Sequence, residues 1–200
     1  MDGRRTPGRA RGCSADRCAA RPGAGARVLV ICTGNVARSV MAGAMLEHLA
    51  GAHGLDVTVT TAGILAVEGQ RASMRTRAAL AAVTGLPAAS VGGHRSCQLT
   101  GDHLRDADLV VAMELDHVRY VRRKHPGAAA RTATLRRLAA QLEPAGTPLA
   151  ERVASLGLAA APLDPAEEVA DPAGQPDEAY VECARELWSL CSQVAPRLAP

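Results

Sequence analysis

The feature that most constrains this chain is a short apolar run, residues 28–31, that leads directly into a loop carrying a thiol and a guanidinium. The loop reads Cys32-Thr33-Gly34-Asn35-Val36-Ala37-Arg38-Ser39. A cysteine six residues before an arginine has the spacing needed to wrap a loop around one phosphate-sized anion. The Gly34-Asn35 pair permits the left-handed or closely packed backbone conformations that such a loop requires. The segment therefore predicts a buried strand followed by an anion-binding loop.

A helix is expected to follow the loop. Apolar residues recur there at helical spacing, at Met41, Met45, Leu46 and Leu49, until Gly51. The first turn of a helix presents unpaired N–H groups and the positive end of the helix dipole, which strengthens the anion site. The strand before the loop and the helix after it distinguish this cysteine–arginine pair from a second one, since Cys191 and Arg197 are also six residues apart. That second pair has no strand before it, no glycine between its members and no helix after it, so we assign the anion loop to residues 32–39.

The composition limits the class of protein. Hydrophobic residues make up 48% of the 200 residues, which allows a substantial core in a single domain. No stretch approaches the roughly 18 apolar residues that a membrane helix needs, and the N-terminus lacks the apolar segment of a signal peptide. We therefore expect a cytoplasmic protein without a membrane partner. The six cysteines show neither disulfide-framework nor zinc-ligand spacing, so we expect no metal and no cofactor.

The basic excess belongs to one end of the chain. Residues 1–27 carry seven arginines against two aspartates, a local charge of +5, and the whole chain carries +3, so the remainder carries −2. A nucleic-acid partner is therefore not expected. Residues 1–26 are rich in Arg, Gly and Ala without apolar periodicity, which predicts a disordered tail. That tail is either an electrostatic handle for an acidic partner or the product of a mis-assigned start. The folded domain is expected over residues 27–195.

From residue 27 onward the pattern alternates between strands and helices. Strands are expected at residues 27–31, 57–60, 108–112 and the start of 132–142, and helices at 39–49, 73–84, 102–105, 115–124, the rest of 132–142, 149–158 and 176–194. Such alternation predicts an α/β fold of three layers, αβα, with a parallel, doubly wound sheet of about four strands. Within it, residues 144–161 are expected to form a helical insertion. Ligands of such folds bind at the carboxyl ends of strands, where Cys32 lies.

The residue types in the loop suit phosphoryl transfer. The loop N–H groups, the helix N-terminus and Arg38 would all stabilise negative charge on Cys32, and the thiolate is the nucleophilic form of cysteine. The same donors would bind phosphate oxygens, with Arg38 gripping two of them in a planar fork. Ser39 can donate a hydrogen bond to the sulfur as it leaves. The resulting cysteinyl-phosphate needs no metal, but it needs a general acid for the departing alcohol or phenol.

Two Asp-Pro pairs compete for the role of general acid, Asp164-Pro165 and Asp171-Pro172. Proline stiffens the backbone and would hold the preceding carboxyl group on a rim loop. An Asp-Pro pair can also do no more than start a turn. Asp171 lies in a loop that leads directly into the last helix, which favours it over Asp164. Both residues remain candidates for the general acid at this point.

The chain resembles the low-molecular-weight protein tyrosine phosphatase family from about residue 27 to about residue 190. The resemblance is carried by loop 32–39, Thr61-Ala62-Gly63, residues 94–99 (His-Arg-Ser-Cys-Gln-Leu), residues 108–113 and Asp171-Pro172. It implies hydrolysis of a phosphomonoester on a phosphorylated protein, or of a small aryl phosphate. The oligomeric state is left open, with a monomer favoured.

The resemblance also implies a role for each residue of the site. Cys32 would be the nucleophile, Arg38 the phosphate clamp and Asp171 the general acid. Phosphate would be bound by Thr33, Gly34, Asn35, Val36, Ala37 and Arg38. Hydrogen bonds among Asn35, Ser39, Thr61 and His94 would hold the loop open.

Several positions depart from the family pattern. The second loop cysteine is replaced by Ala37, so Cys32 lacks the neighbour that could shield it from oxidation by forming a disulfide. The proline after the Arg-Ser pair is replaced by Val40. The aromatic residues that flank a phosphotyrosine ring are absent, because Ala173 follows the Asp-Pro pair and residues 64–73 contain no aromatic side chain. These departures bear on the substrate more than on the reaction.

Three alternatives stand beside a tyrosine phosphatase. A thiol-dependent arsenate reductase shares this fold and loop, but Glu114 and Val121 occupy the places of its two relay cysteines. A phosphoarginine phosphatase resembles the family with threonine at the position of Val36, where an apolar residue favours an aryl phosphate. A non-catalytic, phosphate-binding regulatory module would need neither the Cys32 nucleophile nor the Asp171 acid.

Overall fold

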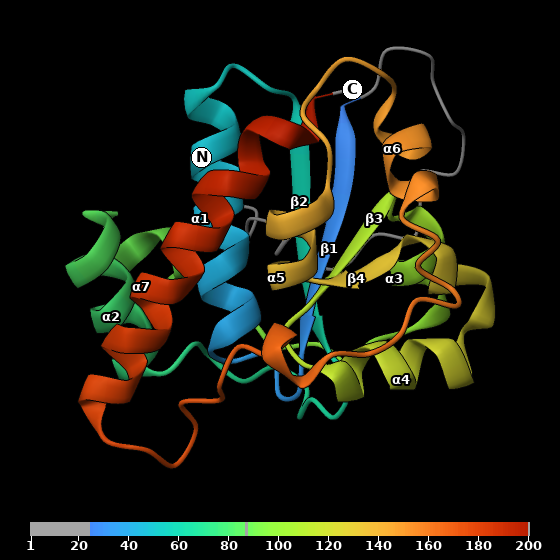
Figure 1. Cartoon of the computed structure of the whole chain (residues 1–200). Helices are drawn as coiled ribbons and strands as arrows, with labels where there is room; N and C mark the ends of the chain where they lie inside the picture. Colours follow the sequence, from blue (N-terminus) through green and yellow to red (C-terminus); the bar gives the residue numbers. More distant parts are fainter. Residues whose placement is uncertain (1–24, 87, 200) are drawn as a thin grey trace, which may run out of the picture.

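Four parallel strands form the centre of the computed structural model, which describes residues 25–86 and 88–199 (Figure 1). They are β1 (Ala26–Cys32), β2 (Val57–Gly63), β3 (Leu109–Ala112) and β4 (Thr132–Thr134), in the order β2-β1-β3-β4. Strand β1 has a parallel neighbour on each side, and its Val30 lies opposite Thr61 of β2 and Val111 of β3. A strand enclosed in this way is expected to be apolar, and β1 is apolar except for Arg27 near its start. The predicted parallel sheet of about four strands is confirmed.

Helices cover both faces of this sheet (Figure 1). One face is covered by α1 (Arg38–Ala52), α2 (Met74–Thr84), α5 (Leu135–Gln141) and α7 (Asp177–Val194), and the other by α3 (Gly101–Asp106) and α4 (Leu115–Lys124). Because side chains of a strand alternate between faces, Val28 and Val30 pack in the larger core with α1 and α7. Leu29 and Ile31 pack in the smaller core with α3 and α4. The predicted three-layer αβα architecture is confirmed.

Local signals place most of the element boundaries. Helix α2 begins after Ser73, whose side chain accepts a hydrogen bond from the Thr76 N–H, and it ends at Gly85, whose φ is +70°. Two elements are longer than expected: α1 continues to Ala52 and β2 continues to Gly63. Both extensions follow from tertiary packing, since α1 contacts α7 and β2 pairs with the whole of β1.

The segment predicted as a helical insertion contains α6 (Leu149–Ser155), which is shorter than the expected 149–158. It is tied to the C-terminal end of the domain by Arg152, which is 4% exposed. The Arg152 guanidinium donates to the backbone carbonyls of Glu143, Thr147, Arg197 and Ala199. The insertion is therefore part of the packed domain.

The ends of the domain differ slightly from the predicted 27–195. The predicted tail lies outside the described residues except for Gly25 and Ala26, and Ala26 is the first residue of β1, where its N–H bonds the carbonyl of Asp56. At the other end, the 3₁₀ turn η4 (Ala195–Leu198) buries Leu198 in the larger core. Across residues 25–86 and 88–199, no helix has the length and apolar character to cross a membrane.

Candidate active site

Cys32 is the last residue of β1, and the chain turns back around its sulfur before α1 begins at Arg38. The turn requires a left-handed backbone at Asn35, where φ is +54°. That conformation aims the Asn35 N–H at the sulfur, with a nitrogen–sulfur distance of 3.3 Å. The Ser39 hydroxyl oxygen lies 3.0 Å from the same sulfur. The thiol of the 3% exposed Cys32 therefore has a backbone N–H and a hydroxyl group within hydrogen-bond distance.

Asn35 also holds the loop through its side chain. Its Nδ2 donates to Ser39 Oγ at 3.0 Å, and its Oδ1 accepts from the Cys97 N–H at 3.0 Å. Because Ser39 Oγ accepts from Asn35, the Ser39 proton is free to point at the Cys32 sulfur. The asparagine thus orients the Ser39 hydroxyl toward the Cys32 sulfur.

Two further predicted loop-supporting residues are linked to Asn35, His94 by a direct hydrogen bond and Thr61 through Cys97. His94 Nε2 donates to the Asn35 carbonyl at 2.7 Å, and burial, aided by the charge of Arg95, lowers the pKa of His94 despite that hydrogen bond. Thr61 lies on β2, and its backbone carbonyl accepts from the Cys97 thiol at 3.2 Å. Among the described residues the Thr61 hydroxyl makes no hydrogen bond to the loop, so Thr61 participates through its backbone.

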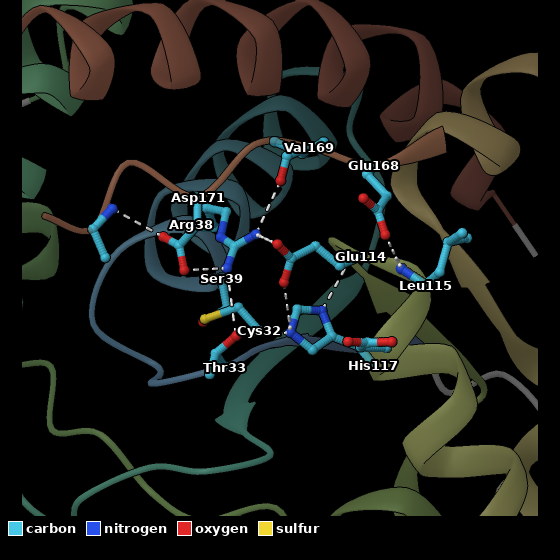
Figure 2. Close-up of polar contacts among 12 residues, drawn as sticks. Cys32, Thr33, Arg38, Ser39, Glu114, Leu115, His117, Glu168, Val169 and Asp171 are labelled. Atoms are coloured by element: carbon cyan, nitrogen blue, oxygen red, sulfur yellow. Dashed lines mark hydrogen bonds and ion pairs between the residues drawn. The ribbon is translucent and has the colours of Figure 1, made fainter. Parts of the chain in front are cut away.

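Arg38 lies at the centre of the site, between two carboxylates (Figure 2). Its side chain is 1% exposed. Nη1 donates to Glu114 Oε1 and to the Val169 carbonyl, both at 2.9 Å, and Nη2 contacts Asp171 Oδ2 at 2.5 Å. Burial acts to lower the pKa of Arg38, but the hydrogen bond that it donates to Glu114 and the charges of Asp171 and Glu114 outweigh burial and raise the pKa. The guanidinium is therefore held charged and in one orientation.

The two Asp-Pro pairs are separated by their surroundings. Asp171 Oδ1 accepts from the Ala173 N–H at 3.1 Å while its Oδ2 contacts Arg38, and its side chain is 36% exposed. Asp164 Oδ1 accepts from the Ala166 N–H at 2.9 Å, at the start of the 3₁₀ turn η3 (Pro165–Glu167). Of the two candidates, only Asp171 contacts the loop arginine.

Two residues of the site, Glu114 and His117, were not among the site residues expected from the sequence, in which Glu114 stands in the place of one arsenate reductase cysteine. Both follow the carboxyl end of β3, which is beside β1 because Ala112 lies opposite Ile31. The fully buried His117 ring accepts the Glu114 N–H at Nδ1, at 3.1 Å, and its Nε2 lies 3.1 Å from Thr33 Oγ1. Their position directly after a parallel strand could have identified them from the sequence, because ligands bind at the carboxyl ends of the strands in such sheets.

Neither a metal site nor a second anion loop is found in the described part of the chain. Among the described residues, no group of His, Cys, Asp and Glu side chains is arranged to hold a metal ion. Cys191 is fully buried in α7, where burial raises its pKa, and Arg197 donates to the carbonyls of Leu138, Ala139 and Leu142. The second cysteine–arginine spacing is therefore structural.

The arrangement combines a buried thiol, a charged guanidinium, a hydroxyl beside the sulfur and a partly exposed carboxylate. A family model described as "low molecular weight phosphotyrosine protein phosphatase" matches residues 27–147. A protein-arginine-phosphatase of Geobacillus stearothermophilus is 32% identical over 174 residues, which are 86% of this chain and 95% of that protein.

Solved structures agree with the sequence match. An arginine phosphatase from Geobacillus stearothermophilus superposes with a TM-score of 0.65 at 30% identity, covering 85% of this chain and 90% of its own. A low-molecular-weight protein tyrosine phosphatase from T. tengcongensis superposes with a TM-score of 0.66 at 30% identity, covering 84% of this chain and 96% of its own. The chain is a member of the low-molecular-weight phosphotyrosine protein phosphatase family.

Proposed function

We propose that this phosphatase works through a cysteinyl-phosphate intermediate, with Cys32 as nucleophile, Arg38 as phosphate clamp and Asp171 as general acid. The observation that supports this most strongly is the meeting of the three groups at the end of β1, although Asp171 lies 133 residues from Arg38 in the chain. One chain supplies every group that the reaction requires, which is consistent with an active monomer.

In the first step the Cys32 thiolate attacks phosphorus and forms the S–P bond. The P–O bond to the substrate breaks, and Asp171 gives its proton to the departing oxygen. In the second step the Asp171 carboxylate takes a proton from water, the water oxygen attacks phosphorus, and the S–P bond breaks. The Ser39 proton, oriented by Asn35, stabilises negative charge on the departing sulfur.

Arg38 and Asp171 must change partners during this cycle. A phosphoryl oxygen that binds Nη2 competes with Asp171 Oδ2 for the same nitrogen. Glu114 and the Val169 carbonyl remain on Nη1 and keep the guanidinium in its plane. Binding of the phosphoryl group therefore releases the Asp171 carboxyl toward the leaving group.

The preferred substrate is a phosphotyrosine side chain of a protein. The loop threonine typical of the phosphoarginine pattern is replaced by Val36, which suits an aryl group. Three exposed aliphatic side chains lie in the part of the chain that follows β2: Leu65 is 71% exposed, Val67 64% and Met74 78%. Leu65 is fixed beside the site because its N–H donates to the Thr33 carbonyl at 2.9 Å.

Phosphoarginine is the second candidate. It is favoured by the 32% identity to a protein-arginine-phosphatase over nearly the full length of both chains. It is also favoured by the lack of aromatic side chains at residues 64–73 and at Ala173. Matched peptides carrying phosphotyrosine or phosphoarginine would decide between the two from the ratio of kcat/KM values.

An arsenate reductase relay is less well supported. It needs reactive thiols besides the nucleophile. Burial raises the pKa of Cys183 to about 12 and also raises that of Cys191, so neither forms a thiolate readily. Cys97 is the remaining cysteine of the described part, and its thiol donates to the Thr61 carbonyl.

The deciding experiment is hydrolysis of p-nitrophenyl phosphate in the presence of EDTA. We expect turnover with the wild-type protein and none with Cys32→Ser, because the thiolate supplies the nucleophile without a metal. Activity that disappears with the chelator and returns with a divalent metal would overturn the mechanism. A Cys32→Ser protein that retains turnover would do the same.

A further inference from the structure

We propose that the Thr33 hydroxyl is a hydrogen-bond donor to the bound phosphoryl group, and that His117 directs its proton there. The inference rests on the proposed function, since it adds a contact inside the same phosphate site. It starts from the 3.1 Å contact between Thr33 Oγ1 and His117 Nε2, two atoms that come from residues 84 positions apart (Figure 2).

The position of the proton on His117 follows from its neighbours. The Glu114 N–H donates to Nδ1 at 3.1 Å, so Nδ1 presents a lone pair. A neutral ring must then carry its proton on Nε2. Burial, and secondarily the charge of Arg38, lowers the pKa of His117 to about 3, which keeps the ring neutral. Nε2 is therefore a donor, and the Thr33 oxygen accepts from it.

The same oxygen faces a second donor. Arg38 Nη2 lies 3.5 Å from Thr33 Oγ1, and a guanidinium nitrogen can only donate. A hydroxyl group has two lone pairs and one proton. Since both lone pairs of Thr33 Oγ1 face donors, its proton must point away from His117 and from Arg38.

The direction left for the Thr33 hydroxyl proton is toward the phosphate site. Thr33 directly follows the nucleophile in the chain, and the Arg38 nitrogen beside its hydroxyl is the one that contacts Asp171. The hydroxyl thus lies 3.5 Å from the nitrogen that would grip the phosphoryl group, on the residue next to the sulfur that would receive it. A phosphoryl oxygen held there is an acceptor for the free proton, with the charge-assisted strength of such bonds.

His117 acts through Thr33 and does not exchange protons itself. Its Nδ1 is occupied by a backbone N–H, and its Nε2 proton is shared between Thr33 and Glu114 Oε2, which is 3.3 Å away. Glu114 therefore fixes both the ring of His117 and the guanidinium of Arg38. This makes His117 a positioning residue for Thr33.

The first test replaces the hydroxyl. Thr33→Val keeps the side-chain shape but removes the donor, while Thr33→Ser keeps the donor. We expect Thr33→Val to weaken binding of inorganic phosphate, measured by calorimetry, by roughly 10-fold or more, the range for a hydrogen bond to a charged group. The kcat/KM for p-nitrophenyl phosphate should fall by at least as much. Thr33→Ser should recover most of both losses.

The second test asks whether His117 works through Thr33. His117→Leu removes the donor, whereas a Gln side chain in His117→Gln retains an N–H that can reach Thr33. We expect His117→Leu to reproduce most of the Thr33→Val loss and His117→Gln to recover part of it. In the double variant with Thr33→Val, His117→Leu should cause little further loss, because the shared contact is already gone.

The outcomes separate this inference from the proposed function. Phosphate affinity and kcat/KM of Thr33→Val that equal the wild-type values, while Cys32→Ser is inactive, would overturn the inference and leave the function standing. Additive losses in the double variant would overturn the role of His117. If the wild-type protein lacked turnover but its phosphate binding still depended on the Thr33 hydroxyl, the proposed function would fail and the contact would stand.

Discussion

Glu114 Oε1 lies 2.9 Å from Arg38 Nη1, so the loop arginine is anchored by a residue at the end of a different strand. Arg38 is 1% exposed and Glu114 is 26% exposed, which makes this pair largely shielded from solvent. A buried guanidinium without a carboxylate partner would be strongly destabilising. Glu114 therefore supports the fold as well as the geometry of the site.

Neutralising this carboxylate should lower stability. Glu114→Gln keeps the shape of the side chain but replaces a charge-assisted hydrogen bond with a neutral one. We expect the free energy of unfolding to fall by about 1–3 kcal/mol, measured by urea denaturation. Glu182→Gln is the matched control, because Glu182 is exposed on α7. A loss at Glu114 no larger than at Glu182 would show that the ion pair contributes nothing.

The general acid is tested by comparing the two Asp-Pro pairs. Asp171→Asn should slow hydrolysis of a phosphotyrosine peptide by roughly 10²–10⁴-fold, the usual range for general acid catalysis. The effect on p-nitrophenyl phosphate should be smaller, since that leaving group needs protonation less. Asp164→Asn should change neither rate, because asparagine can still accept the Ala166 N–H. A larger loss at Asp164 would reverse the assignment.

Gly63 allows the close approach of β2 to the phosphate loop. A Cβ atom there would lie 2.6 Å from the Thr33 carbonyl oxygen and 3.0 Å from the Asn35 nitrogen. We therefore expect Gly63→Ala to lower stability by about 1–3 kcal/mol and to reduce kcat by displacing the loop. Gly51→Ala is the control, because a Cβ there meets nothing within 4 Å and alanine favours a helix. Gly63→Ala should lower the free energy of unfolding and Gly51→Ala should raise it. Equal changes in the two variants would contradict this packing argument.

His117 should make stability depend on pH between about 5 and 7. Its folded-state pKa of about 3 lies below its ordinary value of 6.5. The unfolded chain therefore binds a proton as the pH falls below 6.5, while the folded protein does not, and stability decreases. The loss from this residue between pH 7 and pH 5 is about 2 kcal/mol.

The measurement compares wild-type protein with His117→Gln, which cannot titrate. Charged groups that act on this ring are Arg38, Asp116 and Glu114, and all three stay in both proteins. The difference in unfolding free energy between the two proteins should therefore narrow as the pH falls from 7 to 5. Parallel pH dependences would mean that His117 is not held neutral by the fold.

Removing residues 1–24 should leave the catalytic rate and the thermal midpoint nearly unchanged. This segment has no apolar periodicity with which to join the core. The cut must stop before Ala26, whose N–H bonds the Asp56 carbonyl at 3.0 Å. A large fall in the thermal midpoint of the truncated protein would show that the segment packs against the domain.

The part of the site formed by loop 32–39 could be predicted from the sequence, because its residues are close together in the chain. Cys32, Arg38 and Ser39 lie within residues 32–39, which join β1 to α1, so spacing, glycine content and helical periodicity were enough to predict a loop around an anion. The same local signals placed α4 at Leu115–Lys124 and ended α2 at Gly85. Such features depend on backbone conformation over a few residues, and the amino-acid types involved largely determine it.

The other half of the site was decided by tertiary structure. Spacing did not separate Asp171 from Asp164, and no pattern pointed to His117. These residues meet the loop because β3 pairs with β1, which brings Glu114 and His117 to Arg38 and Thr33, and because the chain after η3 returns with Val169 and Asp171. The strand order and the return of the chain depend on contacts between residues 76 (114 − 38) to 133 positions apart. Burial of the two hydrophobic cores stabilises the one arrangement in which these contacts form.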